Sequence, residues 1–284
     1  MPTASSHPAS AAPRPPRRPP PRWGRVLLLA LLLGLSVGGA VYWRYSRQIN
    51  RYARRAWASL TQDRLTGRER TPLLDGYTVH GIDVSAYQGR IDWPEVARHG
   101  VRFAFIKASE GQSLRDARFA RNWRGARAAG ISRGAYHYFQ PNRDGLSQAN
   151  LFVKTVPLAA GDLPPVLDVE ATHFHDVEVM RREVARWLRL VEAHYGVKPI
   201  LYSNYNYYSR HLEGHFDDYP LWLAHYEVAE PALDPSKWII WQHSDESHVP
   251  GIRGTVDFNV FRGNYQALLA LRVPARKPPP PDRR

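Results

Sequence analysis

Residues 163–172 read LPPVLDVEAT, a short apolar run that ends in two acids, Asp168 and Glu170. The valine and leucine residues of this run favour a buried β-strand. Residues two apart on a strand point to the same side, so both carboxylates are expected on one face. A strand that enters a protein core should not finish with two like charges on one side. The end of this strand is therefore a candidate functional site.

Seven further apolar runs of similar length lie on either side of this stretch. They are TVHGIDVS (78–85), FAFIKASEG (103–111), GAYHYFQP (134–141), PILYSNYNYY (199–208), LWLAHY (221–226), WIIWQHS (238–244) and TVDFNVF (255–261). Helical patterns separate the early runs, at residues 93–100, 117–130, 146–156 and 177–196. The last pattern places Val179, Val184, Trp187, Leu188 and Val191 at helical spacing, and Gly196 follows as a C-terminal stop.

This alternation determines the predicted fold class. Strands that alternate with helices predict βα units and a parallel sheet, so the class is α/β. Eight candidate strands favour closure into a barrel. The connections between the last three strands are too short for full helices. We therefore predict an abbreviated TIM-like (β/α) barrel, smaller than the usual ~250 residues.

An uncharged segment precedes the predicted barrel. Residues 26–43, VLLLALLLGLSVGGAVYW, contain 18 residues without a charge. At about 1.5 Å per residue this length nearly crosses a hydrocarbon core of roughly 30 Å, and Tyr42 and Trp43 suit an interfacial aromatic belt. We predict one transmembrane helix that serves as an anchor. A cleavable signal peptide is the alternative, because Gly38 and Ala40 are small residues at plausible cleavage positions.

The remaining segments complete the predicted domain organisation. It consists of a disordered Pro/Arg-rich tail at 1–25, the anchor at 26–43, a basic juxtamembrane linker at 44–76, the catalytic barrel at 77–271 and a disordered tail at 272–284. Arginines flank the anchor almost equally on both sides, so the positive-inside rule does not orient it.

The positive charge of the chain lies mainly in these flanking segments. The net charge is +13, but the first 70 residues hold 13 Arg against two acids, and the last 13 residues hold five bases against one acid. Residues 71–271 have 21 bases and 23 acids and are nearly neutral. We interpret the charge as facing a membrane and expect no nucleic-acid partner. The chain has no cysteine, which excludes disulfides, thiolate metal sites and cysteine nucleophiles.

Acidic residues recur at the ends of the candidate strands. Asp83 ends the first strand, Glu110 follows the second, and Asp257 lies on the last. The carboxyl ends of barrel strands meet at one face, where active sites are built. Convergent carboxylates push their pKa values apart, so one can stay protonated while another is charged. This arrangement suits glycoside hydrolysis, which needs a proton donor and a second carboxylate.

Aromatic residues near the same strand ends favour a sugar ligand, since their flat rings pack on sugar C–H faces. The candidate substrate-binding residues are Tyr87, Glu110, Tyr136, Tyr138, Tyr202, Trp222, Tyr226 and Trp241.

A zinc site is the competing interpretation of these strand ends. His137, His225 and His243 also lie near strand ends and could in principle bind zinc together with Asp83. These three histidines form no HxH or HExxH spacing, and the sequence has no glycine-rich phosphate loop and no dinucleotide fingerprint. We therefore predict neither a metal nor a cofactor.

Six segments in sequence order resemble glycoside hydrolase family 25, the Chalaropsis-type lysozymes. They are GIDVSAYQGRIDW, FAFIKASEG, GAYHYF, PPVLDVEAT, LWLAHY and WQHS…VPGIRGTVDFNVF. The resemblance covers about 195 residues. It implies an irregular barrel of five βα units and three further strands, which cleaves the β-1,4 bond between N-acetylmuramic acid and N-acetylglucosamine.

The resemblance also implies roles for the acids. Glu170 is expected as the general acid/base, and Asp168 as its partner, either a nucleophile or the group that orients the substrate's N-acetyl group. Asp83 and Asp257 are expected as flanking acids of the same pocket. The four acids are therefore the predicted catalytic residues.

The predicted function is a membrane-anchored peptidoglycan hydrolase, an N-acetylmuramidase. Its expected location is the bacterial inner membrane, as a single-pass protein whose catalytic domain faces the periplasm or the cell exterior. Two alternatives remain open: a non-catalytic membrane anchor that binds the cell wall, and a metal-dependent polysaccharide deacetylase on the same barrel. The sequence does not identify protein partners, the oligomeric state, or a retaining, substrate-assisted or inverting course.

Overall fold

The computed structural model describes residues 73–275. The predicted N-terminal tail, the predicted anchor at 26–43, nearly all of the linker and residues 276–284 of the predicted C-terminal tail lie outside this range, so their boundaries stay predictions. The first residues of that C-terminal tail are described, and Val273 hydrogen-bonds the backbone of Gly161 and Asp162. Within the described residues, no helix is both long enough and apolar enough to cross a membrane.

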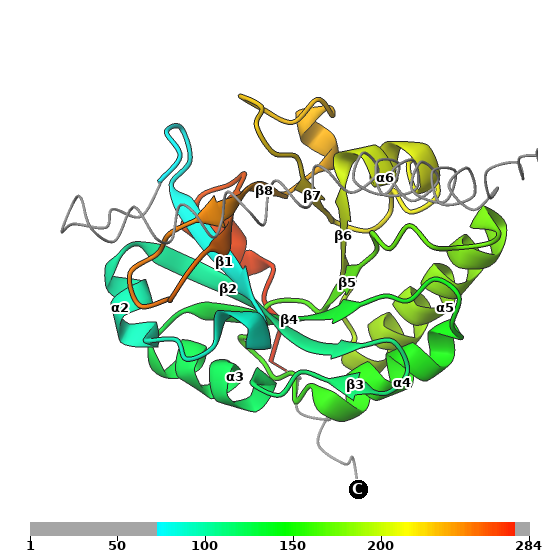
Figure 1. Ribbon diagram of the computed structural model, residues 1–284, viewed down its shortest axis with the longest axis horizontal. Coiled ribbons are helices and arrows are strands. Elements are labelled where there is room, and N and C mark those ends of the chain that lie inside the picture. The colour runs from blue at the N-terminus through cyan, green and yellow to red at the C-terminus, as the bar shows by residue number, and fades with distance from the viewer. Residues whose placement is uncertain (1–72, 276–284) are drawn as a thin grey trace, which may run out of the picture. The chain divides into compact units, whose positions relative to one another are not determined.

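A closed ring of eight strands forms the centre of the described region (Figure 1). The strands are β1 (Val79–Val84), β2 (Val101–Glu110), β4 (Ser132–Tyr138), β5 (Val166–Asp168), β6 (Ile200–Asn204), β7 (Leu221–Ala224), β8 (Ile240–Ser247) and β9 (Val256–Phe261). Strand β1 pairs with both β2 and β9, which closes the sheet. A ninth strand of two residues, β3 (Leu114–Arg115), pairs with the end of β2. The prediction of an eight-stranded barrel is confirmed.

Strand β9 differs in direction from the seven others. Strands β1 to β8 of the ring are parallel to their neighbours, whereas β9 is antiparallel to both β8 and β1. Only residues 248–255 connect β8 to β9, too few for the crossover that a parallel pair requires. The start of β9 therefore lies at the end of the barrel where the parallel strands finish. Asp257 is directly opposite Asp83 in this register.

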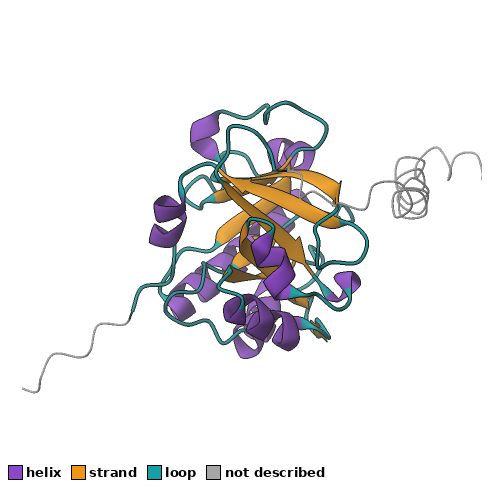
Figure 2. Cartoon of the chain, turned by 90° about the vertical axis from the view of Figure 1, so that its left-hand side faces the viewer, coloured by secondary structure: helices purple, strands orange, loops and turns teal. Residues whose placement is uncertain are grey.

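Helices surround the ring on its outer side (Figure 2). They are α2 (Trp93–Arg98), α3 (Phe119–Ala128), α4 (Gly145–Thr155), α5 (Val177–Tyr195), α6 (Tyr205–His211) and α7 (Tyr265–Ala270), together with the short 3₁₀ helices η1 (Ala86–Gln88) and η2 (Pro235–Lys237). Helices α2 to α6 each follow one strand of the ring, which gives five βα units before the last three strands. The run 199–208 was wrongly expected to be all strand, because Asn204 caps a helix by accepting a hydrogen bond from the Tyr207 N–H.

The longest helix, α5, follows its sequence pattern with one exception. Asp176 caps its start, and Gly196 ends it in the left-handed conformation at φ 70°. Trp187 and Leu188 are fully buried against the sheet, as predicted. Val179 is 37% exposed instead, because it lies off the buried stripe, where Met180 takes its place.

The barrel interior has an apolar floor and a polar mouth. The floor is a cluster formed mainly by Val79, Phe103, Phe105, Leu163, Val166, Ile200, Ile240 and Phe261. Two glycines make room for the phenylalanine rings: a Cβ at Gly81 or Gly134 would lie 2.4 Å from Phe103 or Phe105, respectively. Side chains two residues further along the strands reach the mouth, and most of them are polar. The apolar floor therefore supports a polar site.

Candidate active site

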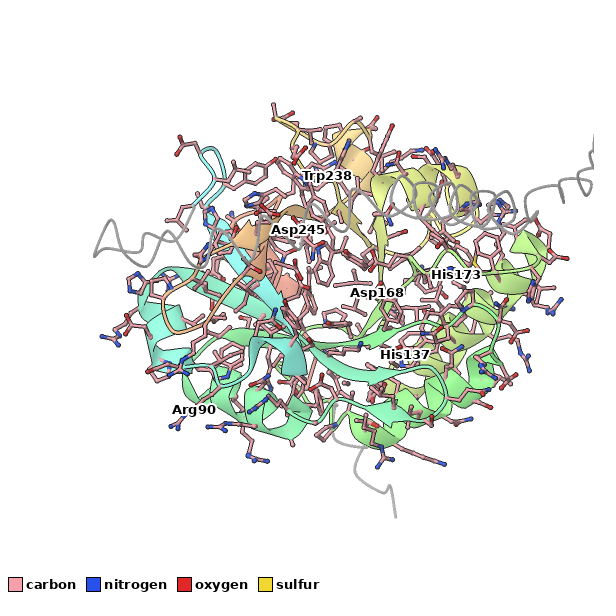
Figure 3. All side chains as sticks on the ribbon, viewed as in Figure 1. Arg90, His137, Asp168, His173, Trp238 and Asp245 are labelled. Carbon is pink, nitrogen blue, oxygen red and sulfur yellow. The ribbon has the colours of Figure 1, made fainter. Side chains whose placement is uncertain are left out.

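The end of β5 presents its two acids to the mouth of the barrel. Val166 belongs to the interior cluster, whereas Leu167 and Val169 pack in the outer layer between strands and helices. This alternation continues past the end of the strand, so Asp168 and Glu170 both line the interior cavity. Figure 3 shows Asp168 within the ring of strands, while Arg90 lies at the outer surface. The two-residue spacing therefore places both acids as predicted.

The structure brings all four predicted catalytic acids into one cavity of about 220 Å³. Its lining consists of Asp83, Lys107, Tyr136, Tyr138, Asp168, Glu170, Tyr202, Trp222 and Asp257. These side chains come from β1, β2, β4, β6, β7 and β9 and from the end of β5. Asp257 reaches the cavity because β9 runs in the opposite direction and begins at this mouth.

Asp83 is buried, and two amides hold it. Its Oδ2 accepts hydrogen bonds of 2.8 Å from Gln242 Nε2 and from Asn259 Nδ2. Burial raises the pKa of Asp83 to about 6, and hydrogen bonds from Asn259, Gln242 and Asp257 oppose this rise. Burial and hydrogen bonding therefore act in opposite directions on the ionisation of Asp83.

Asp168 is also buried, and its charged form is disfavoured more strongly. Burial comes first among the causes that hold the pKa of Asp168 well above its usual range, and the neighbouring Glu170 charge comes second. Its Oδ1 has no hydrogen-bond partner among residues 73–275. Since buried polar atoms are rarely left unpaired, this oxygen is a natural contact for a ligand in the cavity.

Lys107 supplies an ammonium group to the lining that the sequence analysis did not single out. Its Nζ lies 2.7 Å from Glu110 Oε2 and 5.0 Å from the centre of the Tyr138 ring. Its positive charge opposes the rise in the pKa of Asp168. Glu110 does not line the cavity itself; it pairs with Lys107 and accepts a hydrogen bond from Gln140.

The sequence analysis also did not identify Gln242 and Asn259 as residues of the site. Both are buried and face inward, two residues beyond Ile240 and Asp257 respectively. The period-two register of a strand could have identified them, as it could have identified Lys107 two residues after Phe105. The sequence analysis considered only acids and aromatic residues, so it did not identify the amides and the lysine at the same inward positions.

The predicted aromatic residues other than Trp241 divide into three groups. Four line the cavity, namely Tyr136, Tyr138, Tyr202 and Trp222. Tyr226 is outside the lining, and its hydroxyl donates a hydrogen bond to Gln242 Oε1. Tyr87 is 72% exposed on η1, directly after β1, and is not part of the cavity wall.

Trp241 was wrongly predicted to bind substrate. Its side chain is only 1% exposed and packs in the outer layer, where its Nε1 donates to the carbonyl of His225. Strand β8 turns Ile240 and Gln242 inward and therefore turns Trp241 outward.

The three histidines considered for zinc do not converge with Asp83. His137 is buried in the outer layer, between Ser109 and Gln148 as hydrogen-bond partners, and burial lowers its pKa to about 4. His225 stacks on Tyr205, and His243 packs against Trp241. In the part of the chain that the structure describes, no group of three or more His, Cys, Asp or Glu is placed to hold a metal ion. The zinc interpretation therefore lacks a geometric basis.

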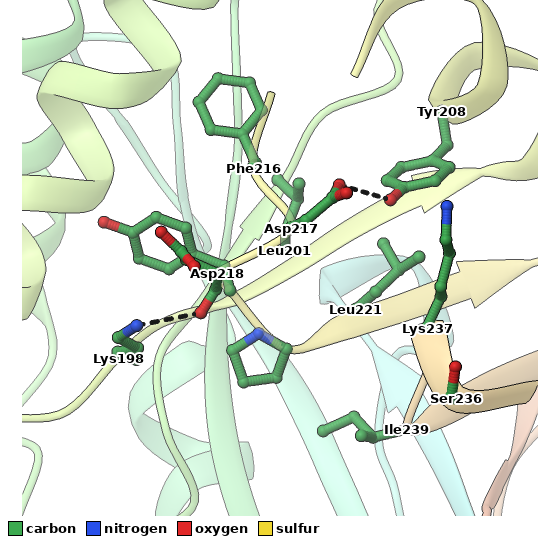
Figure 4. Close-up of a pocket in the computed structure, with 12 residues that line it drawn as sticks. Lys198, Leu201, Tyr208, Phe216, Asp217, Asp218, Leu221, Ser236, Lys237 and Ile239 are labelled. Atoms are coloured by element: carbon green, nitrogen blue, oxygen red, sulfur yellow. Dashed lines mark hydrogen bonds between the residues drawn. The ribbon is translucent and has the colours of Figure 1, made fainter. Parts of the chain in front are cut away.

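A second cavity, of about 350 Å³, lies at the opposite end of β6, β7 and β8 (Figure 4). Asp217 accepts there from the hydroxyl of Tyr208, and Lys198 donates to the backbone carbonyl of Asp218. None of the four predicted catalytic acids lines it. The amino ends of barrel strands generally serve stability rather than catalysis.

Comparison with known proteins agrees with the chemistry of the acidic cavity. Residues 82–252 match the sequence profile of glycosyl hydrolases family 25. This range contains Asp83, Asp168 and Glu170, while Asp257 lies just beyond it.

Individual relatives cover most of the described barrel. Lysozyme M1 of Streptomyces globisporus is 35% identical over 208 residues, which cover 68% of this chain and 71% of that protein. The uncharacterized protein YegX of Escherichia coli K12 is 49% identical over 200 residues, which cover 69% and 74% of the two chains. The crystal structure of a bacterial lysozyme from Streptomyces coelicolor superimposes with a TM-score of 0.65 at 34% identity, covering 70% of this chain and 98% of that one.

Proposed function

Because the chain belongs to glycosyl hydrolase family 25, we propose that its acidic cavity is the active site of a lysozyme and that Glu170 and Asp168 carry the reaction. The chain is a glycoside hydrolase and acts on peptidoglycan as an N-acetylmuramidase. The bond that it hydrolyses is the β-1,4 linkage between N-acetylmuramic acid and N-acetylglucosamine. The observation that carries the assignment of the site is the convergence of four carboxylates in one small cavity.

In this proposal Glu170 is the general acid/base. It protonates the glycosidic oxygen that leaves, and it then activates the incoming water. Asp168 stabilises the positive charge that develops at the anomeric carbon, either as a nucleophile or by orienting the N-acetyl group of the substrate. Since the two groups repel each other within one cavity, a single proton shared between them leaves one acid and one base.

Asp83 and Asp257 complete the site in this proposal as flanking acids. The negative charge of Asp83 disfavours ionisation of Asp168 and so helps to retain a proton in the cavity. The tyrosines and Trp222 offer ring faces and hydroxyls to the sugars. The two alternative functions, wall binding without catalysis and metal-dependent deacetylation, do not require a proton donor at Glu170.

The test uses the purified full-length chain in detergent, incubated with peptidoglycan. Glu170→Gln keeps the size of the side chain and removes the proton donor, so release of reducing ends should fall at least ~100-fold. Glu213→Gln, which alters only an exposed ion pair with Lys237, should retain activity. Products reduced with borohydride and identified by mass spectrometry should carry the new end on N-acetylmuramic acid. Near-normal turnover by Glu170→Gln would exclude its role, and intact glycan with retained binding would favour the wall-binding alternative.

The location of the enzyme is a further part of the proposal. An anchor at residues 26–43 would hold the barrel on the outer side of the bacterial inner membrane, where peptidoglycan lies. The uncharged segment supports an anchor, and the peptidoglycan substrate supports the outer side, because the arginines on the two sides of the segment are nearly balanced. Hydrolysis would then be limited to wall within reach of the linker.

A further inference from the structure

Two buried side-chain amides share one carboxylate oxygen in the mouth of the barrel. Gln242 and Asn259, from neighbouring strands β8 and β9, each donate to Asp83 Oδ2 at 2.8 Å. Both amides are buried, so neither hydrogen bond is replaced readily by water. Hydrogen bonds to a charged group in such surroundings are among the strongest in proteins.

The orientation of both amides is determined by a second layer of donors. Gln242 Oε1 accepts from the hydroxyls of Tyr202, at 2.7 Å, and Tyr226. Asn259 Oδ1 accepts from Trp222 Nε1 at 2.8 Å. An indole N–H can only donate, so Asn259 must turn its oxygen toward Trp222 and its NH₂ group toward Asp83. The tyrosine hydroxyls favour the corresponding orientation of Gln242.

We propose that Gln242 and Asn259 are positioning residues that hold the Asp83 carboxylate in its working rotamer and in its charged form. The proposal rests on the assignment of Asp83 to the active site. The two amides occupy Oδ2, and Asp83 also interacts with Asp257 and lines the cavity. Asp83 then provides the fixed negative charge that keeps a proton on the Asp168–Glu170 pair.

Several charged and titratable groups face Asp83 and must be considered together with the amides. They are Asp257 on β9, Asp168 on β5, Tyr136 and Tyr202, and the ammonium of Lys107 across the cavity. Without the two amides, burial and the other acids would favour the neutral form of Asp83. A neutral Asp83 would no longer help to retain the proton on its neighbours.

A contribution to stability alone does not explain why Gln242 and Asn259 both donate to Asp83. Replacement of buried polar networks by apolar residues of similar volume is often neutral or stabilising. Two amides that converge on one buried acid therefore need a reason other than stability. Control of the charge on Asp83 supplies that reason.

The experiment compares three full-length variants with the wild type. Gln242→Met removes the donor and keeps the volume. Gln242→Glu keeps the shape and restores a donor only when its carboxyl is protonated. Gln148→Met is the matched control, because Gln148 is an equally buried glutamine that bonds His137 and the backbone N–H of Gln140, outside the cavity.

Activity on soluble peptidoglycan fragments is measured as kcat and KM from pH 4 to pH 8. For Gln242→Met we expect kcat to fall about tenfold or more with KM within about twofold, and the acidic limb of the profile to move up by about one pH unit. Gln242→Glu should recover part of kcat at the acidic end. Gln148→Met should lower thermal stability and leave the shape of the pH profile unchanged.

A titration of the Asp83 carboxyl by ¹³C NMR separates this proposal from the proposed function, because it does not depend on turnover. Its midpoint should rise in Gln242→Met and in Asn259→Leu and stay unchanged in Gln148→Met. An unchanged midpoint in both cavity variants would overturn the proposal, even if the wild type is an active muramidase. An inactive wild type would refute the proposed function and leave the result for Asp83 interpretable.

Discussion

The buried carboxyl group of Asp83 makes the stability of the fold depend on pH. It is buried beside Asp257, and burial raises its pKa to about 6, compared with 3.8 for the free group. A group that binds its proton more tightly in the folded chain stabilises the fold only while it is protonated. Acids held in such surroundings are typical of active sites, where stability and activity conflict.

Asp83→Asn should therefore change how stability depends on pH. Below about pH 4 both the folded and the unfolded chain carry the neutral acid, so the stabilising contribution of the protonated Asp83 is fully present. As the pH rises to about 6, the unfolded chain ionises first, and the wild type loses about 2–3 kcal/mol on this account. Urea denaturation at pH 4 and pH 7 should show a smaller loss for Asp83→Asn than for the wild type. Equal losses in the two proteins would show that Asp83 has no raised pKa.

Three acids of the cavity could be predicted from the sequence because each one breaks an apolar run near its end. Asp168 and Glu170 are found in this way, and so is Asp83. Lys107, Gln242 and Asn259 lie at the same inward positions, but a lysine or an amide near a strand end is common in loops and caps. Only the register of the closed barrel shows that these side chains turn inward. Trp241 illustrates the opposite error, since an aromatic residue on a buried strand can face either side.

Gly134 on β4 and Gly196 after α5 are required for different structural reasons. Gly134 on β4 lies under the ring of Phe105, and Phe105 stacks on Trp222 with ring centres 4.8 Å apart. Gly196 ends α5 at φ 70°, and a Cβ there would meet no atom within 4 Å. The first glycine is needed for space inside the barrel. The second is needed for its left-handed backbone conformation.

Substitution by alanine should distinguish these two constraints. Gly196→Ala should lower the free energy of unfolding by about 1 kcal/mol through backbone strain and leave activity unchanged. Gly134→Ala should cost more, about 1–3 kcal/mol, and should also lower kcat, because a displaced Phe105 moves Trp222 in the cavity wall. The measurements are urea denaturation and turnover per folded molecule. If Gly134→Ala kept full activity, the apolar floor would not position the site as described.

The boundaries of most elements follow from hydrophobic period and capping residues, which act locally. Helix α5 (Val177–Tyr195) follows its apolar pattern and ends before Gly196, the predicted stop. The direction of β9 is a different kind of property. It depends on the short connection from β8 and on the requirement that β9 also pair with β1. The two strands are far apart in the sequence: Asn259 on β9 and Asp83 on β1, whose side chains share a hydrogen bond, are separated by 176 positions. Such long-range pairing leaves no local signal in the sequence.

The net positive charge of the chain lies mainly outside the barrel. The described barrel is nearly neutral and holds four of its acids in the cavity, while most of the net charge of +13 belongs to the flanking segments. A nearly neutral catalytic body is not drawn to anionic surfaces by its own charge, so its location must depend on the segments around it. The predicted anchor at residues 26–43 is the segment suited to this task.

The full-length chain should therefore stay with the membrane when electrostatic contacts are removed. An apolar helix of 18 residues resists a wash in 1 M salt, because screening weakens attraction between charges but does not weaken hydrophobic insertion. A matched chain that begins at residue 44 keeps the basic linker and lacks the apolar segment, so salt should release it. Fractionation followed by immunoblotting measures both chains, and the size of the retained band shows whether cleavage has occurred. Release of the full-length chain by salt, or a shorter soluble product, would indicate peripheral attachment or a cleaved signal peptide instead of an anchor.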